Sequence, residues 1–266
     1  MNFIKKNKVV LIILSLVLIY GIIMIFVLKN DNKTNNNNSS NNKTNINYLL
    51  INNISNWSYS NDKWNSLTNK EVAEANATYK AFVNNNYLGE YKVLYGTKWN
   101  LIDNDNNIVV YNGNLIAYST NFNINISHLS SRKINSDDEK LIKEQYSFAN
   151  LSDLTDNEVY DVDLDNNGTK DEVICLSNVG STSSLTSYFN LLIIKYNDDI
   201  KTLISENIKP EDMLDSKTYY ISLISNINDS DISSIIVGYK YGSEAGKPGN
   251  MLFSYENNNF NKVYSD

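Results

Sequence analysis

Short apolar runs separated by polar turns make up most of the chain beyond residue 47. Before residue 130, the segments YLGEYKVLYGTKW and NNIVVYNGNLIAYS are rich in tyrosine and β-branched residues. Beyond residue 150 the same pattern continues in FNLLIIKYN, IKTLIS, TYYISLIS, SIIVGYKY and MLFSYE. Such runs, bounded by turn residues at short intervals, are typical of strands in antiparallel sheets. Asparagine pairs mark many of the breaks and tolerate left-handed backbone, so the pattern predicts a mainly β fold with asparagine-rich hairpin ends.

Two short segments carry helix signals instead. Thr68 and Glu71 match a capping box at a helix start. The apolar residues that follow at helical spacing are Val72, Ala75, Tyr79 and Phe82. The stretch SDDEKLIKEQY begins with Ser136 as a capping residue and places Glu139 at the box position. With KPEDML as a turn or short helix, the sequence predicts one or two short helices.

The amino-terminal pattern is different, because residues 9–28 are apolar without a single charge. About 20 residues at ~1.5 Å rise span ~30 Å, the thickness of a bilayer's hydrocarbon core. Lys5, Lys6 and Lys8 precede the run and favour an inside amino terminus. A cleaved signal peptide is the alternative, but the run is long and no A-x-A-like site ends it. Residues 1–29 are therefore predicted to be a single-pass membrane anchor with the rest of the chain outside the cell.

The remaining chain divides into a tether and two β-rich parts. Residues 30–47, NDNKTNNNNSSNNKTNIN, have almost nothing to bury and are expected to form a flexible tether. The two β-rich subdomains are expected at residues 48–133 and 134–266, joined near the second predicted helix.

Charge and single-residue counts exclude several functions. The formal net charge of −7 argues against nucleic-acid binding, because no basic face can neutralise phosphates. One cysteine, Cys175, excludes an intramolecular disulfide, and its apolar surroundings predict a buried side chain. His128 is the only histidine, so multi-histidine metal sites are excluded, and its polar stretch predicts a surface residue.

The stretch DVDLDNNGTKDEVI, residues 161–174, carries the sharpest chemical signal. Taking Asp163 as position 1 gives D-x-D-x-N-G-x-x-D, with alternate side chains that can converge on one point. Gly168 permits a sharp turn, and the position-7 carbonyl of Thr169 can face inward. Asp171 adds a carboxylate, so the loop offers an oxygen-only cage suited to a hard cation such as Ca²⁺. The alternative is a solvated polar turn without an ion.

A D-x-D-x-N-G-x-x-D loop that runs directly into a strand resembles the FG-GAP or VCBS-type repeat of integrin-like β-propellers. The EF-hand glutamate at position 12 is replaced by Ile174, and no helix follows as in dockerins. The resemblance implies calcium held by five residues of a loop between neighbouring strands of a blade. These are Asp163, Asp165, Asn167, Thr169 (through its backbone) and Asp171.

Two weaker echoes of this loop are present. Asn226-Ile-Asn228-Asp229-Ser-Asp231 precedes a strand-like run but lacks the glycine, so it is expected to form a turn without metal. Asp103-Asn-Asp105 is weaker still. Three such units cannot close an ordinary propeller, so partial propeller-like blades are expected.

The remaining motifs favour a binding role. The stretch GSEAGKPG has the wrong spacing for a phosphate loop and is expected to be a long hairpin loop. Trp57, Trp64 and Trp99 are expected mainly in the core, with a glycan-stacking platform as the alternative. No carboxylate pair is recognisably catalytic. The sequence therefore predicts a membrane-anchored extracellular binding or scaffolding module stabilised by calcium, with a cell-surface protein or glycan as ligand. The alternative is a surface hydrolase that uses carboxylates and holds a structural calcium.

Overall fold

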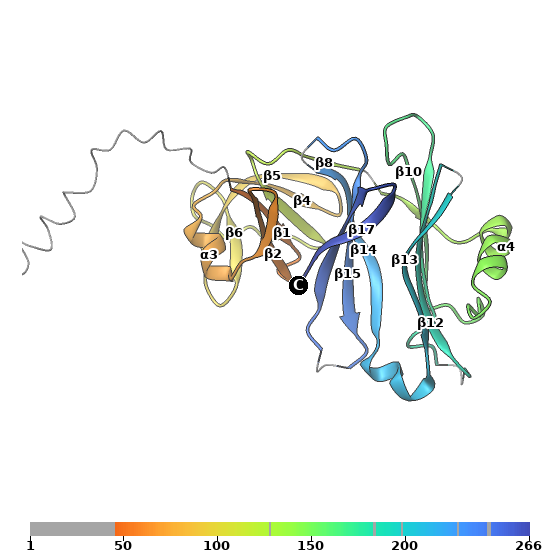
Figure 1. The fold of residues 1–266 in the computed structure, drawn as a ribbon. Coiled ribbons are helices and arrows are strands. Elements are labelled where there is room, and N and C mark those ends of the chain that lie inside the picture. The colour runs from red at the N-terminus through yellow and green to blue at the C-terminus, as the bar shows by residue number, and fades with distance from the viewer. Residues whose placement is uncertain (1–45, 128, 183–184, 198, 228, 244–245) are drawn as a thin grey trace, which may run out of the picture. The chain divides into compact units, whose positions relative to one another are not determined.

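The computed structural model describes residues 46–127, 129–182, 185–197, 199–227, 229–243 and 246–266. These residues belong to one compact unit, Thr44–Asp266. The predicted anchor, the tether up to residue 45 and His128 lie outside the described residues. None of the helices in the described part of the chain has the length and apolarity needed to cross a membrane. The fold is mainly β with antiparallel sheets, as the apolar pattern predicts, and part of it curls into a half-barrel that the pattern does not predict (Figure 1).

The first sheet has seven strands in the order β3-β2-β1-β7-β4-β5-β6. Its strands are β1 Asn47–Ile51, β2 Ser55–Ser60, β3 Lys63–Ser66, β4 Tyr79–Val83, β5 Asn86–Tyr95, β6 Trp99–Ile102 and β7 Leu115–Ser119. All its pairings are antiparallel. Tight turns at Asn52, Asn61 and Asn84 have positive φ, because asparagine tolerates this backbone better than most residues do. The predicted asparagine-rich hairpin ends are confirmed there.

Two five-stranded sheets follow, in the orders β13-β12-β11-β10-β9 and β17-β16-β15-β14-β8. The strands of the former are β9 Ser131–Arg132, β10 Asp156–Val162, β11 Asp171–Ser177, β12 Tyr188–Tyr196 and β13 Asp199–Ile208. The strands of the latter are β8 Ile124–Ile126, β14 Lys217–Ile227, β15 Ser234–Tyr241, β16 Gly249–Glu256 and β17 Asn259–Ser265. β8 and β9 are neighbours in sequence, yet each completes a different sheet.

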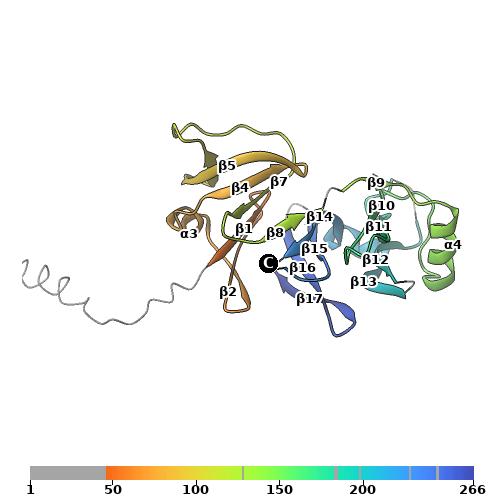
Figure 2. The same cartoon turned by 90° about the horizontal axis from the view of Figure 1, so that it is seen from above.

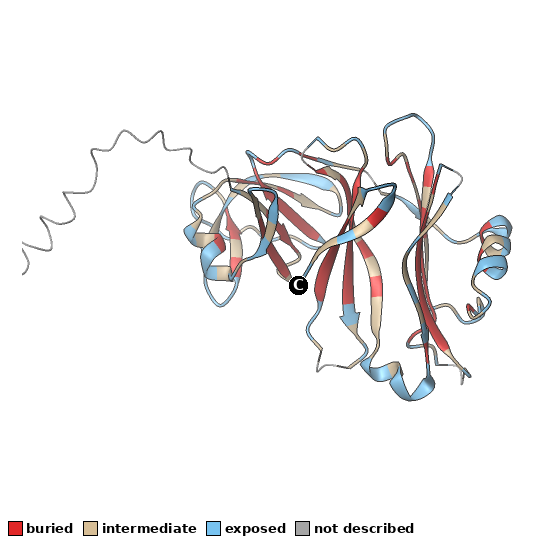
Figure 3. Cartoon of the chain, viewed as in Figure 1, coloured by how far each residue is buried: buried red, intermediate tan, exposed pale blue. Residues whose placement is uncertain are grey.

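The central part of the β14–β17 sheet is buried on both faces. On β15, Ile235 and Val237 pack into a core shared with β10–β12, whereas Ile236 between them packs against the first sheet. Side chains on a strand alternate between faces, so a continuous apolar run such as SIIVGY is what a doubly covered strand requires. Buried positions accordingly run along these central strands (Figure 3). The sheet of β10–β13 is covered on its other face by α4 and the segment after it.

Three short helices are present among the described residues, one more than the upper limit of the prediction. They are α3 Asn69–Glu74, α4 Ser136–Gln145 and the 3-10 helix η1 Pro210–Asp215. The capping box of Thr68 and Glu71 is confirmed. The helical face through Tyr79 and Phe82 is wrong, because α3 ends at Glu74 and both residues lie on β4.

The predicted cap of α4 is wrong by one residue. Asn135 is the N-cap, and its side chain accepts hydrogen bonds from the backbone amides of Asp137 and Asp138. In return, the carboxylate of Asp138 at the third position accepts a hydrogen bond of 2.9 Å from the backbone amide of Asn135. Asparagine caps helices as well as serine does, so Ser136 becomes the first helical residue and Glu139 lies outside the box.

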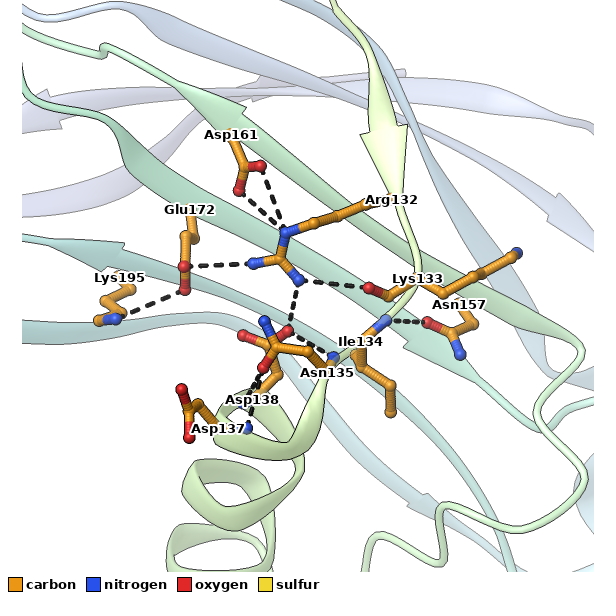
Figure 4. Close-up of polar contacts among 10 residues, drawn as sticks. All are labelled: Arg132, Lys133, Ile134, Asn135, Asp137, Asp138, Asn157, Asp161, Glu172 and Lys195. Atoms are coloured by element: carbon orange, nitrogen blue, oxygen red, sulfur yellow. Dashed lines mark hydrogen bonds and ion pairs between the residues drawn. The ribbon is translucent and has the colours of Figure 1, made fainter.

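Arg132 joins α4 to the β9–β13 sheet and is the only arginine in the chain. Its guanidinium forms ion pairs with Asp138 of α4 at 2.5 Å, Asp161 of β10 at 3.2 Å and Glu172 of β11 at 3.2 Å (Figure 4). The carboxylate of Asp138 is the most buried of the three, with 4% of its side chain exposed. A planar guanidinium with five donors suits such a multi-carboxylate contact. These ion pairs fix the helix against the sheet.

Candidate metal centre

The acidic loop joins β10 to β11 and is held by its own buried leucine. Val162 and Asp171 are paired at the two ends of the loop, so Asp171 is the first residue of β11. Leu164 has no exposed surface and lies in the core between the two five-stranded sheets. Its carbonyl also accepts a hydrogen bond of 2.7 Å from the backbone amide of Ser233. With Leu164 fixed inward, Asp163 and Asp165 on either side of it are half-buried on the opposite side of the strand end.

Side-chain hydrogen bonds shape the turn that follows. The carboxylate of Asp163 accepts bonds from the backbone amides of Asn167 at 3.1 Å and Gly168 at 2.8 Å. Asn166 and Gly168 have φ of 57° and 87°. A side chain at 87° would be strained, and glycine adopts that conformation without steric cost. The glycine that the motif predicted at the sharp turn is therefore required by its backbone.

Three of the five predicted ligand residues are brought together. Asp163, Asp165 and Asp171 each offer one carboxylate oxygen, and these atoms lie within 4.8 Å of one another. None of the ion pairs among the described residues joins these acids to a lysine or arginine. Like charges at this separation repel each other, so the cluster has an uncompensated negative charge. The Asp triad can hold a metal ion.

Asp171 is the most constrained of the three acids. It is 6% exposed, and its pKa is raised chiefly by burial, with a contribution from the charges of Asp165 and Asp163. Backbone amides of Leu164 and Asn197 oppose this shift by donating hydrogen bonds to the carboxylate, the former at 3.0 Å. Because Asp171 is buried beside two other carboxylates, its charged form would be stabilised more by a bound cation than those of the half-buried Asp163 and Asp165.

Asn167 and Thr169 stay predictions as ligands. The side-chain oxygen of Asn167 accepts a hydrogen bond from the backbone amide of Thr169 at 2.7 Å, and its amide nitrogen donates to Asp165 at 3.0 Å. Rotating the Asn167 amide would replace that donor with an oxygen facing Asp165. The side chain already lies beside the triad, so coordination requires a local change only.

Tyr196 is a residue of this site that sequence reasoning missed. Its hydroxyl, at the end of β12, donates a hydrogen bond of 3.1 Å to Asp165. Burial and this bond to a carboxylate raise the pKa of Tyr196 to about 12, so the phenol stays protonated at neutral pH. No motif marks the contact, because strand pairing alone brings Tyr196 to the loop from 31 residues away.

The two echoes of the loop differ from it in chemistry. The side chain of Asp103 accepts hydrogen bonds from the amides of Asp105 at 2.9 Å and Asn107 at 2.8 Å, in a similar turn. Yet across the residues that the structure describes, Asp163, Asp165 and Asp171 are the only cluster of three or more potential metal-ligating side chains. The echo near Asn226 is described except for residue 228, and Ser233, two residues after its Asp231, makes the backbone bond to Leu164.

The other predicted features are settled in part. Cys175 is buried, as predicted, and burial raises the pKa of its thiol to about 12. Trp57 and Trp99 are fully buried in the core, whereas Trp64 is half-buried and lines a groove. The loop between β15 and β16 is described except for residues 244–245.

Comparison with protein-family models, curated proteins and solved structures finds no match for this chain.

Proposed function

We propose that the protein is a membrane-anchored extracellular binding or scaffolding module whose acidic loop holds a calcium ion. The observation that carries the metal site is the convergence of Asp163, Asp165 and Asp171 without a compensating lysine or arginine among the described residues. All the side chains offered are oxygen donors, which suit Ca²⁺ and Mg²⁺ rather than softer metals. Calcium is favoured over Mg²⁺, because Ca²⁺ accepts the irregular arrangement of ligands that a loop offers, whereas Mg²⁺ demands a near-ideal octahedron.

The resemblance to FG-GAP and VCBS-type repeats is proposed on the same loop. Two features support it: the loop connects neighbouring antiparallel strands, β10 and β11, and it is hydrogen-bonded to the echo near Asn226 through Leu164 and Ser233. The two five-stranded sheets that carry these loops pack on a common core. We interpret the two sheets as divergent blade-like units, the first with a metal loop and the second without.

Calcium should raise the melting temperature of the full-length protein. A site without the glutamate at position 12 is expected to have a Kd on the order of 10⁻⁴–10⁻³ M, as in extracellular modules. About 5 mM Ca²⁺ would then stabilise the folded state by about 1–2 kcal/mol, or roughly 2–8 °C. Asp165→Ala should abolish the shift, which differential scanning calorimetry measures directly.

Asp103→Ala is the matched control, because Asp103 organises a similar turn outside any acidic cluster. It should leave the calcium shift unchanged, and equal Mg²⁺ should produce a smaller shift than Ca²⁺. A wild-type protein whose melting temperature does not respond to several millimolar calcium would show that the loop is an ordinary polar turn.

The membrane anchor and topology form a separate part of the proposal. Residues 9–28 are uncharged and apolar, and the segment after them is rich in asparagine, a composition in which cleavage by an added protease is expected. Protease added to intact cells should release a folded fragment that begins within residues 30–47. An immunoblot of cells and medium with an antibody to the last strands makes the measurement. Protection of the carboxyl-terminal part, or a mature chain that starts near residue 30, would contradict the anchor.

A further inference from the structure

We propose that a groove between the first sheet and the β14–β17 sheet binds a neutral oligosaccharide. This inference rests on the proposed binding function and assigns it a site and a ligand class. The groove has a volume of about 570 Å³, within the range of about 300–1,000 Å³ found for small-molecule sites. Its lining comes from the β2–β3 hairpin on one side and from β14–β17 and their loops on the other.

The two hairpins that wall the groove are preformed. The turn of β2–β3 has Asn61 and Asp62 at φ of 50° and 58°, and that of β16–β17 has Asn257 and Asn258 at 54° and 63°. Two-residue turns with positive φ at both positions match the twist of paired strands. Both hairpins project to the same side in Figure 2. Fixed walls reduce the entropy lost when a ligand binds.

Aromatic side chains supply the apolar part of the lining. Tyr59, Trp64, Tyr255 and Tyr264 all contact the groove and are half-buried. Other rings support them. The ring centroids of Trp64 and Tyr264 lie 5.8 Å and 5.3 Å from that of the buried Trp57. The ring centroid of Tyr255 lies 5.0 Å from that of Phe260. Such rings offer an apolar surface together with a polar edge. The C–H faces of sugar rings pack on surfaces of this kind.

Hydroxyl and carboxylate groups supply the polar part. Ser234 and Ser254 lie on the neighbouring strands β15 and β16 and line the groove, and their hydroxyl groups share a hydrogen bond of 2.9 Å. Asp62 and Glu256 are exposed at the hairpin ends and contribute acceptors, while Lys63 contributes a donor. Sugar hydroxyls both donate and accept, so this mixture suits them.

The charge balance of the groove argues for an uncharged ligand. Two carboxylates and one lysine line it, and the chain as a whole carries a formal net charge of −7. A phosphate or sulfate group would meet repulsion rather than a cluster of cations. A cation held by the aromatic rings is the competing outcome, which the experiment below separates from sugar binding.

The groove is distinct from the Asp triad but linked to it through the backbone. Ile232 and Ser234 line the groove, and the amide of Ser233 between them donates to Leu164 of the acidic loop. None of the three triad residues contacts the groove. Calcium binding and oligosaccharide binding can therefore be tested as separate properties.

Binding is measured with the full-length protein, purified in a detergent without a sugar headgroup. The probes are an array of neutral tetrasaccharides of glucose, galactose, mannose and N-acetylglucosamine, their sulfated counterparts, and choline. At least one neutral tetrasaccharide should bind in titration calorimetry. Trp64→Ala should weaken it at least about tenfold, as for a central aromatic contact, and Glu256→Gln by a few-fold. Tyr95→Ala removes a 52% exposed aromatic outside the groove and should change nothing.

The outcomes separate the two proposals. If Trp64→Ala does not fold, Ser254→Ala and Glu256→Gln decide, because each removes only a small polar contact. Absence of binding to every neutral probe, affinity unchanged in the groove variants, or preference for sulfated sugars or choline would overturn the inference. A calcium-induced shift in melting temperature without sugar binding would reject the groove alone. Sugar binding without a calcium response would reject the metal site alone.

Discussion

Replacing Arg132 by alanine should lower the free energy of unfolding by about 3–5 kcal/mol. The guanidinium is the shared partner of Asp138, Asp161 and Glu172. Glu172 also pairs with Lys195 at 3.6 Å, so removing the cation of this partly buried network leaves chiefly Asp138 and Asp161 uncompensated. The side chain of Asp138 is almost fully buried, so its carboxylate would lose the most. Urea denaturation followed by tryptophan fluorescence would give the change in midpoint and slope.

The free energy of unfolding of Arg132→Lys should lie between those of the wild type and Arg132→Ala. Lysine keeps one positive charge but cannot present a planar fork to several carboxylates at once. Lys143→Ala is the matched control, since its ion pair with Glu139 on the same helix is exposed on both sides, and such pairs contribute about 0–1 kcal/mol. A loss for Arg132→Ala no larger than that of Lys143→Ala would show that the ion pairs do not fix α4.

Leu164→Ala should lower the free energy of unfolding by about 2–5 kcal/mol. It should also reduce the rise in melting temperature that calcium causes. The side chain has no exposed surface and lies in the core shared by the two five-stranded sheets, where truncation leaves a cavity. Because Leu164 separates Asp163 from Asp165, loosening it should let the two carboxylates drift from Asp171. Calorimetry with and without calcium measures both effects in one experiment.

Leu164→Met is the matched control for this second effect. Methionine keeps most of the volume and costs less than about 1.5 kcal/mol in typical cores, so the calcium-dependent shift should persist. If Leu164→Ala were destabilised yet kept the full calcium shift, the buried leucine would be a core residue with no part in positioning the acids.

Local sequence patterns predicted the strands and the acid triad because both depend on residues close together in the chain. The run Ile235-Ile236-Val237 places apolar side chains on both faces of its strand, and both faces are buried in the structure. Asp163 and Asp165 alternate around a buried residue, and Asp171 returns to them across a tight turn. Their proximity follows from spacing alone, whereas the identity of the ion stays a prediction.

Contacts between distant segments could not be predicted in the same way. The partners of Arg132 come from α4, β10 and β11, and the sequence RKINSDD gives no sign of Asp161 or Glu172. Residue type alone predicts the same burial for Trp64 and Trp57, yet of these two only Trp57 is fully buried. The exposure of Trp64 depends on where the β2–β3 hairpin meets β17, which is a property of sheet packing.

The contacts of Asp266 bear on the order in which the chain can fold. Its carboxylate accepts hydrogen bonds from Trp57, 209 residues earlier, at 2.8 Å and from Ser55, 211 residues earlier. Contacts of such long sequence separation form late, because the loop they close is long. By contrast, most paired strands are consecutive in the sequence and form hairpins. The first sheet can therefore form early, yet the indole N–H of Trp57 lacks its hydrogen-bond partner until synthesis has reached Asp266. During that interval its aromatic neighbourhood is open to aggregation or to a chaperone.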